Sequence, residues 1–255
     1  MKAIILAAGE GSRLRPYTID CPKCLVEVNG STILDQQINI LKSEGINDIQ
    51  VVGGFKADKL REKEYNLIIN KDYAETNMVH TLFCAEKELN TDILVSYGDI
   101  VYSRDILKTL LQSNFDIAVS IDMNWRNYWE SRTDNPLDDV ETLRLSKVGK
   151  ILEIGRKPKS LDEVEGQYMG LMKFSKKGVS TLKKFYQRCK KTSGFLAGKP
   201  IHNAYMTDLL QEMIDQKITI NAIPVKGDWI EIDTVDDLKS DITQNRLKRI
   251  SKKMK

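Results

Sequence analysis

Hydrophobic and polar positions follow two repeating patterns along this chain. Short runs of consecutive apolar residues are typical of strands buried on both faces, and apolar residues three to four apart are typical of helices. Strands are expected at 2–6, 49–52, 67–69, 92–97, 116–122, 168–174, 218–223 and 229–232. Helices are expected at about 33–44, 77–89, 105–113, 179–189 and 209–214, and after Thr234. The alternation predicts an α/β fold with a doubly wound, mainly parallel mixed sheet.

The alternation is interrupted by an insertion at about residues 123–170. Within it, two short strands at 141–145 and 150–154 flank a Lys-Val-Gly turn, which predicts a small β-hairpin lobe. We therefore expect one domain at residues 1–244 that includes this lobe. A basic tail at residues 245–255 follows it.

Charge distinguishes the body of the chain from its end. The net charge is +3, but the last eleven residues hold six cations, and removing these from the 39 leaves 33 against 36 anions. A solvated helix end is one interpretation of this tail, and contact with a membrane surface or nucleic acid is the alternative. The chain is 41% apolar and should bury a core, and no apolar run is long enough to cross a membrane. We expect a cytoplasmic protein with no transmembrane segment and no nucleic-acid partner.

The four cysteines are too few for a disulfide framework. Cys21 and Cys24 have the spacing of a metal or redox pair, but the chain has no second pair and only two histidines. We therefore expect both thiols to be reduced and to bind no metal.

The first strand runs directly into the loop Ala-Ala-Gly-Glu-Gly-Ser-Arg-Leu at residues 7–14. Glycines let backbone N–H groups approach an anion, and the guanidinium of Arg13 matches phosphate oxygens. A Walker loop is excluded because no lysine follows Gly11, and Leu14 makes the match to a dinucleotide fingerprint only partial. The loop predicts a phosphate site, and a glycine-rich turn without a ligand is the alternative.

Two aspartates follow predicted strands and are candidate metal ligands. Asp99 comes after Gly98 at the end of strand 92–97, and Asp233 follows strand 229–232. Ligands of parallel sheets bind outside the carboxyl ends of the strands. Because Mg²⁺ takes one or two carboxylates together with substrate phosphates, the pair predicts Mg²⁺ as a cofactor. Asp233 could instead serve the N-terminus of the helix that follows it.

Several stretches resemble the sugar-phosphate nucleotidylyltransferase family. They occur in the family's order and are Leu-Ala-Ala-Gly-Glu-Gly-Ser-Arg-Leu at 6–14, Pro22-Lys23, Gly98-Asp99, residues 153–158 and residues 229–234. Residues 77–82, 96–102 and 170–174 are similar to cytidylyltransferases for small amino-phosphates, such as phosphocholine, aminoethylphosphonate and phosphoglutamine. The resemblance covers nearly the whole chain and implies a Rossmann-like nucleotidyltransferase fold.

The resemblance also implies a reaction and its residues. CMP would pass from CTP to a small amine-bearing phosphate or phosphonate with release of pyrophosphate, feeding the modification of cell-surface or capsule polysaccharide. Arg13, Lys23 and Lys157 are the implied catalytic residues, and Asp99 and Asp233 the Mg²⁺ ligands. The predicted nucleotide-binding residues are Leu6, Ala8, Gly9, Gly11, Ser12, Arg13, Lys23, Gly54, Asn77 and Gly98.

The aromatic insertion is the predicted acceptor pocket. The acceptor-binding residues are expected to be Trp125, Trp129, Arg132, Tyr168, Lys157 and Glu231. Aromatic faces would attract an amine or a quaternary ammonium, whereas Arg126 or Arg132 could pair with a carboxylate. The alternative is that the tryptophans only cover the core.

The sequence is also compatible with two other functions and with a homodimer. One is transfer to a sugar 1-phosphate, and the other is a non-catalytic module that binds a nucleotide sugar. Two phosphate-binding cations together with two metal-ligand aspartates favour an enzyme, because a sensor need not keep all four. Release of pyrophosphate from CTP would distinguish an enzyme from a sensor.

Overall fold

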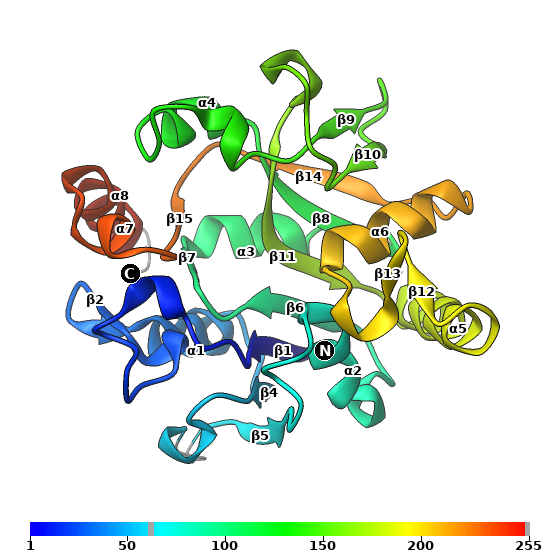
Figure 1. Cartoon of the computed structure of the whole chain (residues 1–255), viewed down its shortest axis with the longest axis horizontal. Helices are drawn as coiled ribbons and strands as arrows, with labels where there is room; N and C mark the ends of the chain where they lie inside the picture. Colours follow the sequence, from blue (N-terminus) through cyan, green and yellow to red (C-terminus); the bar gives the residue numbers. More distant parts are fainter. Residues whose placement is uncertain (61–63, 253–255) are drawn as a thin grey trace.

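The computed structural model describes residues 1–60 and 64–252. At its centre is a seven-stranded sheet with the order β14-β8-β11-β6-β1-β4-β5 (Figure 1). Its strands are β1 (Lys2–Ala7), β4 (Asp48–Gly53), β5 (Asn66–Ile69), β6 (Ile93–Tyr97), β8 (Ile117–Asp122), β11 (Gln167–Phe174) and β14 (Asn221–Val225). Strand β11 pairs antiparallel with both of its neighbours, and all other pairs are parallel. The predicted mainly parallel mixed sheet is confirmed.

Helices cover both faces of this sheet, because its central strands are apolar on both sides. In β1, Ile5 belongs to one hydrophobic cluster, while Ile4 and Leu6 belong to another. The cluster around Ile5 includes residues of α1 (Ile33–Ser43), α3 (Arg104–Leu111) and α8 (Asp241–Lys252). The other includes residues of α2 (Met78–Cys84), α5 (Lys176–Thr192) and α6 (Met206–Asp215).

The predicted insertion lies between β8 and β11 in sequence, and its apolar residues belong to both hydrophobic clusters. It contains α4 (Trp125–Trp129) and an antiparallel hairpin of β9 (Leu143–Leu145) and β10 (Ile151–Ile154), as expected. A second small sheet pairs β7 (Ile100–Tyr102) with β15 (Trp229–Glu231), and α7 (Val235–Lys239) follows. Two further pairs are β2 (Glu27–Val28) with β3 (Ser31–Thr32), and β12 (Phe195–Leu196) with β13 (Lys199–Pro200).

Two sequence expectations need correction. The strand expected at 218–223 begins at Asn221, because residues 218–220 connect α6 to the sheet. The boundary expected at residue 244 falls inside α8, whose Leu247 and Ile250 are buried. Residues 245–252 therefore belong to the fold through Arg246, Leu247 and Ile250, while the cations Lys248, Arg249 and Lys252 are exposed as expected of a solvated helix end. Residues 253–255 lie outside the described range. Within the described ranges, no helix has the length and apolar character needed to span a membrane.

Candidate active site

The glycine loop after β1 forms one wall of a cavity at the carboxyl edge of the sheet. Gly11 has a φ of 64°, in the left-handed region that favours glycine, and a Cβ there would lie 3.0 Å from the Cβ of Lys23. The hydroxyl of Thr18 donates to the carbonyl of Gly11 at 2.7 Å. The turn thus brings the lysine against the loop, although eight residues separate Lys23 from Leu14 in sequence.

The cavity has a volume of about 320 Å³ and collects residues from the ends of several strands. All predicted nucleotide-binding residues line it except Gly54. Gly54 lies behind the loop, where a Cβ would come within 2.8 Å of the carbonyl oxygen of Ala8. Residues that sequence reasoning missed complete the lining: Ala7, Cys24, Tyr73, Thr76, Met78, Thr81 and Tyr97. Most of these come from loops and helix starts, where no motif marks them.

Cations and carboxylates meet at the floor of this cavity. The ammonium of Lys23 donates to Asp99 Oδ2 at 2.7 Å and also to Asp233, and Arg13 pairs with Asp233 on the other side. Burial alone would lower the pKa of Lys23, but Asp99 and Asp233 raise it above its ordinary value. Burial alone would raise the pKa of Asp233, but Lys23 and Arg13 hold it below its ordinary value. Lys23 is therefore a fixed charge at neutral pH.

Asp99, Glu231 and Asp233 form a cluster whose carboxylate oxygens lie within 4.8 Å of one another. Among the described residues, the buried Oδ1 of Asp99 has no hydrogen-bond partner. Burial, followed by the charges of Asp233 and Asp99, raises the pKa of Glu231 to about 8. Three hard oxygen donors with an unsatisfied acceptor fit a divalent cation such as Mg²⁺. Sequence reasoning missed Glu231 as a third member, although alternation along β15 places it on the same face as Asp233.

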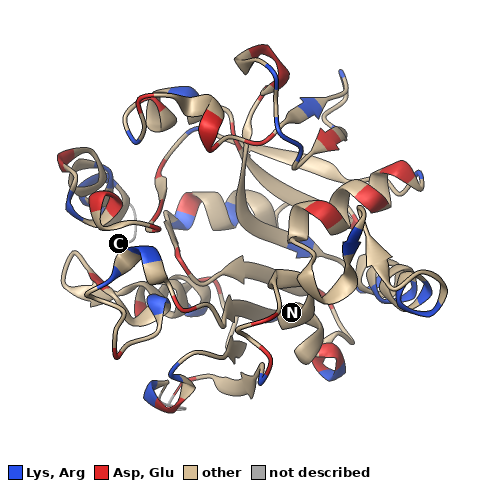
Figure 2. Cartoon of the chain, in the orientation of Figure 1, with Lys and Arg blue, Asp and Glu red and all other residues tan. Residues whose placement is uncertain are grey.

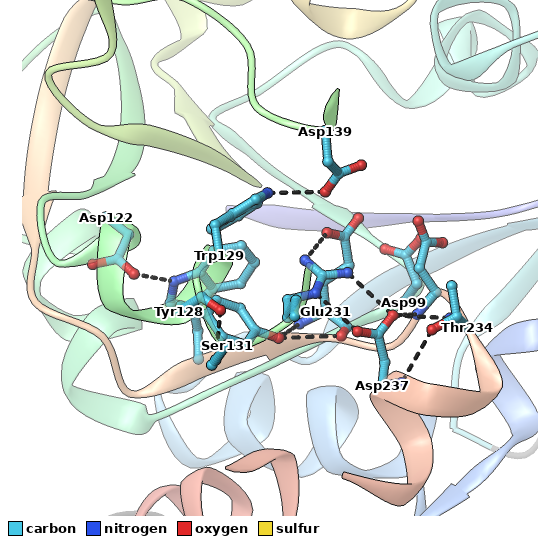
Figure 3. Close-up of polar contacts among 12 residues, drawn as sticks. Asp99, Asp122, Tyr128, Trp129, Ser131, Asp139, Glu231, Thr234 and Asp237 are labelled. Carbon is cyan, nitrogen blue, oxygen red and sulfur yellow. Dashed lines mark hydrogen bonds and ion pairs between the residues drawn. The ribbon is translucent and has the colours of Figure 1, made fainter. Parts of the chain in front are cut away.

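The alternative role of Asp233 as a helix cap is not what the structure shows. Thr234 is the N-cap of α7, and its hydroxyl accepts the N–H of Asp237 at 3.0 Å. The carboxylate of Asp237 accepts the N–H groups of Asp233 and Thr234 at 3.0 and 2.9 Å (Figure 3). The side chain of Asp233 therefore pairs with Lys23 and Arg13 and does not cap α7.

A second cavity of about 360 Å³ opens beside the first. Arg13, Met78, Tyr97, Glu231 and Asp233 line both cavities. Its own lining is aromatic and acidic, and includes Trp129, Tyr168, Tyr205, Trp229, Asp139, Glu141 and Thr207. Of the predicted acceptor-binding residues, Trp129, Tyr168 and Glu231 are therefore at this cavity.

The other three predicted acceptor-binding residues do not line it. Trp125 is buried in the core. Arg132 is held by Asp237 at 2.8 Å and by Glu231 at 3.3 Å, which leaves its side chain only 11% exposed. Lys157 is exposed and donates to the carbonyl of Leu137. The core-covering alternative holds for Trp125, and the guanidinium of Arg132 is already paired with carboxylates.

Glu141 is the acidic side chain of the second cavity that sequence reasoning missed. Burial and the charge of Asp208 raise its pKa to about 7, against the opposing effect of Lys199. Asp139, by contrast, accepts the indole N–H of Trp129 at 2.9 Å (Figure 3). Glu141 lies in the hairpin lobe, far in sequence from the motifs of the catalytic edge, so no local pattern identified it.

Comparisons with known proteins identify relatives of this chain. Residues 3–152 match the sequence model of the MobA-like NTP transferase domain. A CTP:phosphoglutamine cytidylyltransferase of Campylobacter jejuni is 42% identical over 253 residues, covering 95% of this chain and 99% of that protein. A choline-phosphate cytidylyltransferase of Streptococcus pneumoniae is 34% identical over 156 residues, covering 60% of this chain and 67% of that protein.

Solved structures share the fold. An inositol-1-phosphate CTP transferase of T. maritima superposes with a TM-score of 0.75 at 20% identity, covering 97% of this chain and 95% of that one. A CTP:phosphocholine cytidylyltransferase of Streptococcus pneumoniae superposes with a TM-score of 0.70 at 24% identity, covering 96% and 98%. At such identities the likeness concerns the fold alone.

Proposed function

Because this chain belongs to the MobA-like NTP transferase family, we propose that it transfers CMP from CTP to a small phosphorylated acceptor and releases pyrophosphate. The observation that carries the proposal is the position of Lys23, between the carboxylates of Asp99 and Asp233 and against a glycine loop. The relatives named as cytidylyltransferases support CTP as the donor.

The reaction is an in-line displacement. An oxygen of the acceptor phosphate forms a bond to the α-phosphorus of CTP, and the bond from that phosphorus to the oxygen bridging the β-phosphorus breaks. Such chemistry depends on positioning and on stabilisation of charge. Lys23, charged in the first cavity and paired with Asp233, which lines both cavities, would stabilise charge on the α-phosphate. Arg13, whose side chain is 63% exposed at the outer lip, would hold the leaving pyrophosphate.

We propose Mg²⁺ as the cofactor, held by Asp99 and Asp233 with Glu231 beside them. The support is the cluster of three carboxylates and the unsatisfied Oδ1 of Asp99. When bound, Mg²⁺ would neutralise negative charge on the substrate phosphates. The chain's own contribution is to hold these oxygens in place through β15 and the end of β6.

We propose that the second cavity holds an acceptor with an amine or another polar nitrogen group. Trp129 and Trp229 are buried, but Tyr168 and Tyr205 are partly exposed and offer faces for a cation, and Glu141 offers a carboxylate. A bound ammonium would favour the ionised form of Glu141, whose pKa is otherwise raised. Arg132 is paired with Asp237 and Glu231, which argues against its use for a substrate carboxylate.

A cytoplasmic location, a homodimer and a role in cell-surface or capsule polysaccharide modification stay as proposals. The similarity to the cytidylyltransferase of Campylobacter jejuni is the support for the last of these. None of the three affects the reaction proposed above.

The test is a screen for pyrophosphate release. CTP, UTP, ATP and dTTP are each combined with phosphoglutamine, phosphocholine, 2-aminoethylphosphonate and glucose 1-phosphate, with Mg²⁺ present. We expect turnover with CTP and an amine- or amide-bearing phosphate, and its loss in Asp99→Asn. Efficient use of glucose 1-phosphate would instead favour a sugar 1-phosphate nucleotidylyltransferase. Binding of nucleotides without pyrophosphate release from any pair would refute the enzymatic proposal.

A further inference from the structure

A further cavity, of about 370 Å³, has a basic lining and lies apart from the two cavities of the catalytic edge. It is bounded by the start of α4, the turn between β14 and β15, and helix α8. Lys226, Arg246 and Arg249 line it and line neither of the other two cavities. Figure 2 shows the basic residues of α8 on the side of the molecule where α4 also lies. The sequence singled out this basic segment, and the proposed reaction does not use it.

Arg246 forms the buried wall of this cavity and is only 9% exposed. Its guanidinium lies 3.9 Å from the centre of the Tyr128 ring and donates one long hydrogen bond, of 3.4 Å, to the carbonyl of Trp229. Burial lowers the pKa of Arg246 and the like charge of Arg249 adds to this effect, while Tyr128, Asp122 and Asp228 oppose it. A guanidinium has five N–H donors, so much of its hydrogen-bonding capacity is left for a ligand.

The remaining lining has the composition of an anion site. Lys226 and Arg249 are exposed at the opening, so the lining holds three cations against one carboxylate, Asp228. The side-chain amides of Asn127 and Asn245 add hydrogen-bond donors. Asp122 and Asp228 offset part of the charge of Arg246, and a bound anion would offset the remaining positive charge. The guanidinium fork matches phosphate oxygens.

We propose that this cavity binds a small soluble anion that carries a phosphate group, separately from CTP and the acceptor. Arg246 would contact the phosphate from inside, and Lys226 and Arg249 would close over it. The volume, close to that of the catalytic cavities, leaves room for a phosphate ester.

The site also connects to the catalytic edge through one ring. The hydroxyl of Tyr128, on which Arg246 stacks, accepts the N–H of Glu231 at 3.1 Å (Figure 3). Glu231 belongs to the carboxylate cluster. An anion that fixes Arg246 would therefore stabilise the strand that carries Glu231, and occupancy should raise the unfolding temperature.

The test is calorimetric titration of the whole protein with inorganic phosphate at constant ionic strength, together with thermal unfolding. The double variant Lys226→Ala/Arg249→Ala removes two cations of the cavity and leaves Arg246 in place. Its control, Lys248→Ala/Lys252→Ala, removes two exposed cations of α8 that do not line the cavity. We expect phosphate affinity to fall about tenfold in the first variant only, and the rise of unfolding temperature with phosphate to become smaller in that variant only.

Other outcomes overturn the proposal. Equal phosphate affinity in both double variants would assign the phosphate to the catalytic cavity. Absence of saturable phosphate binding by the parent would show that the cavity is not a phosphate site. A third outcome is that the parent shows no saturable phosphate binding but binds vesicles of phosphatidylglycerol, and that Lys226→Ala/Arg249→Ala abolishes the vesicle binding. This outcome would show that the basic surface recognises a membrane instead. None of these outcomes bears on pyrophosphate release, so the proposed function is tested separately.

Discussion

Replacing Lys23 by Ala tests the central feature of the site. The ammonium lies 2.7 Å from Asp99 Oδ2 and also contacts Asp233, and the side chain is only 13% exposed. Its removal takes away a positive charge of the first cavity and leaves three carboxylates within 4.8 Å of one another. The variant should therefore lose both rate and stability, for separable reasons.

The expected loss of rate follows from the role of Lys23 at the α-phosphate. Removing one group that stabilises charge in a transition state costs about 10²–10³ in kcat, or about 2.7–4 kcal/mol. The assay is pyrophosphate release under saturating CTP and acceptor at fixed Mg²⁺. Lys56→Ala is the matched control, because it removes the same charge from an exposed side chain, and it should keep parental kcat.

The expected loss of stability follows from burial. Removing one partner of a buried ion pair costs about 3–5 kcal/mol, and the 17% and 18% exposure of Asp99 and Asp233 favours the lower end. For a chain of this size, about 3 kcal/mol lowers the unfolding temperature by about 6–12 °C. If the cluster binds Mg²⁺, the ion should restore part of this loss in Lys23→Ala, since it compensates the same carboxylates.

Parental kcat in Lys23→Ala, with Lys56→Ala also unaffected, would show that the lysine is not part of the chemistry. A normal unfolding temperature in the variant would refute the inferred ion-pair energetics. An unfolding temperature of Lys23→Ala that does not respond to Mg²⁺ would contradict the metal assignment while leaving the catalytic role of the lysine untouched.

The remaining predictions concern the carboxylate cluster, Glu141 of the second cavity, and Arg132. Asp99→Asn or Asp233→Asn should lower turnover by about 10² or more at fixed Mg²⁺ with the fold retained, because an amide compensates less of the metal's charge. Glu141→Gln should raise KM for an amine-bearing acceptor about tenfold and leave KM for CTP unchanged, since it removes the carboxylate that would pair with the amine. Because the pKa of Glu141 is raised to about 7, kcat/KM for that acceptor should increase as pH rises through about 7 and the carboxyl ionises, and Glu141→Gln should lack this increase. Arg132→Ala should cost about 3 kcal/mol in thermal unfolding, because Asp237 is left buried without its partner.

Each of these has a contrary result. Near-parental turnover of the Asn variants would exclude a metal-binding role. Equal changes in KM for both substrates, or a retained pH dependence in Glu141→Gln, would remove Glu141 from the acceptor pocket. A normal unfolding temperature of Arg132→Ala together with a raised acceptor KM would show that the guanidinium binds the acceptor and does not stabilise the fold.

Local pattern determined the elements and much of the catalytic edge. Runs such as Ile4-Ile5-Leu6 are apolar at consecutive positions, which requires burial on both faces, and helices on both sides of the sheet follow. The glycine loop, Lys23, Asp99 and Asp233 each sit within a few residues of a recognisable signature. The carboxyl ends of parallel strands share one edge, so the glycine loop after β1 and Asp99 after β6 could be expected at one cavity. Asp233 reaches this cavity from β15, which pairs antiparallel with β7 outside the main sheet.

Packing between distant segments decided the rest. Arg132 and Glu141 both lie in the insertion. No local feature of the sequence shows that Arg132 pairs with Asp237 or that Glu141 lines a cavity. The last helix is basic in sequence, yet its Leu247 and Ile250 are buried in the core and its Arg246 stacks on the ring of Tyr128. Such outcomes depend on which charges and rings meet across more than a hundred residues of chain, and short-range periodicity carries no information about those encounters.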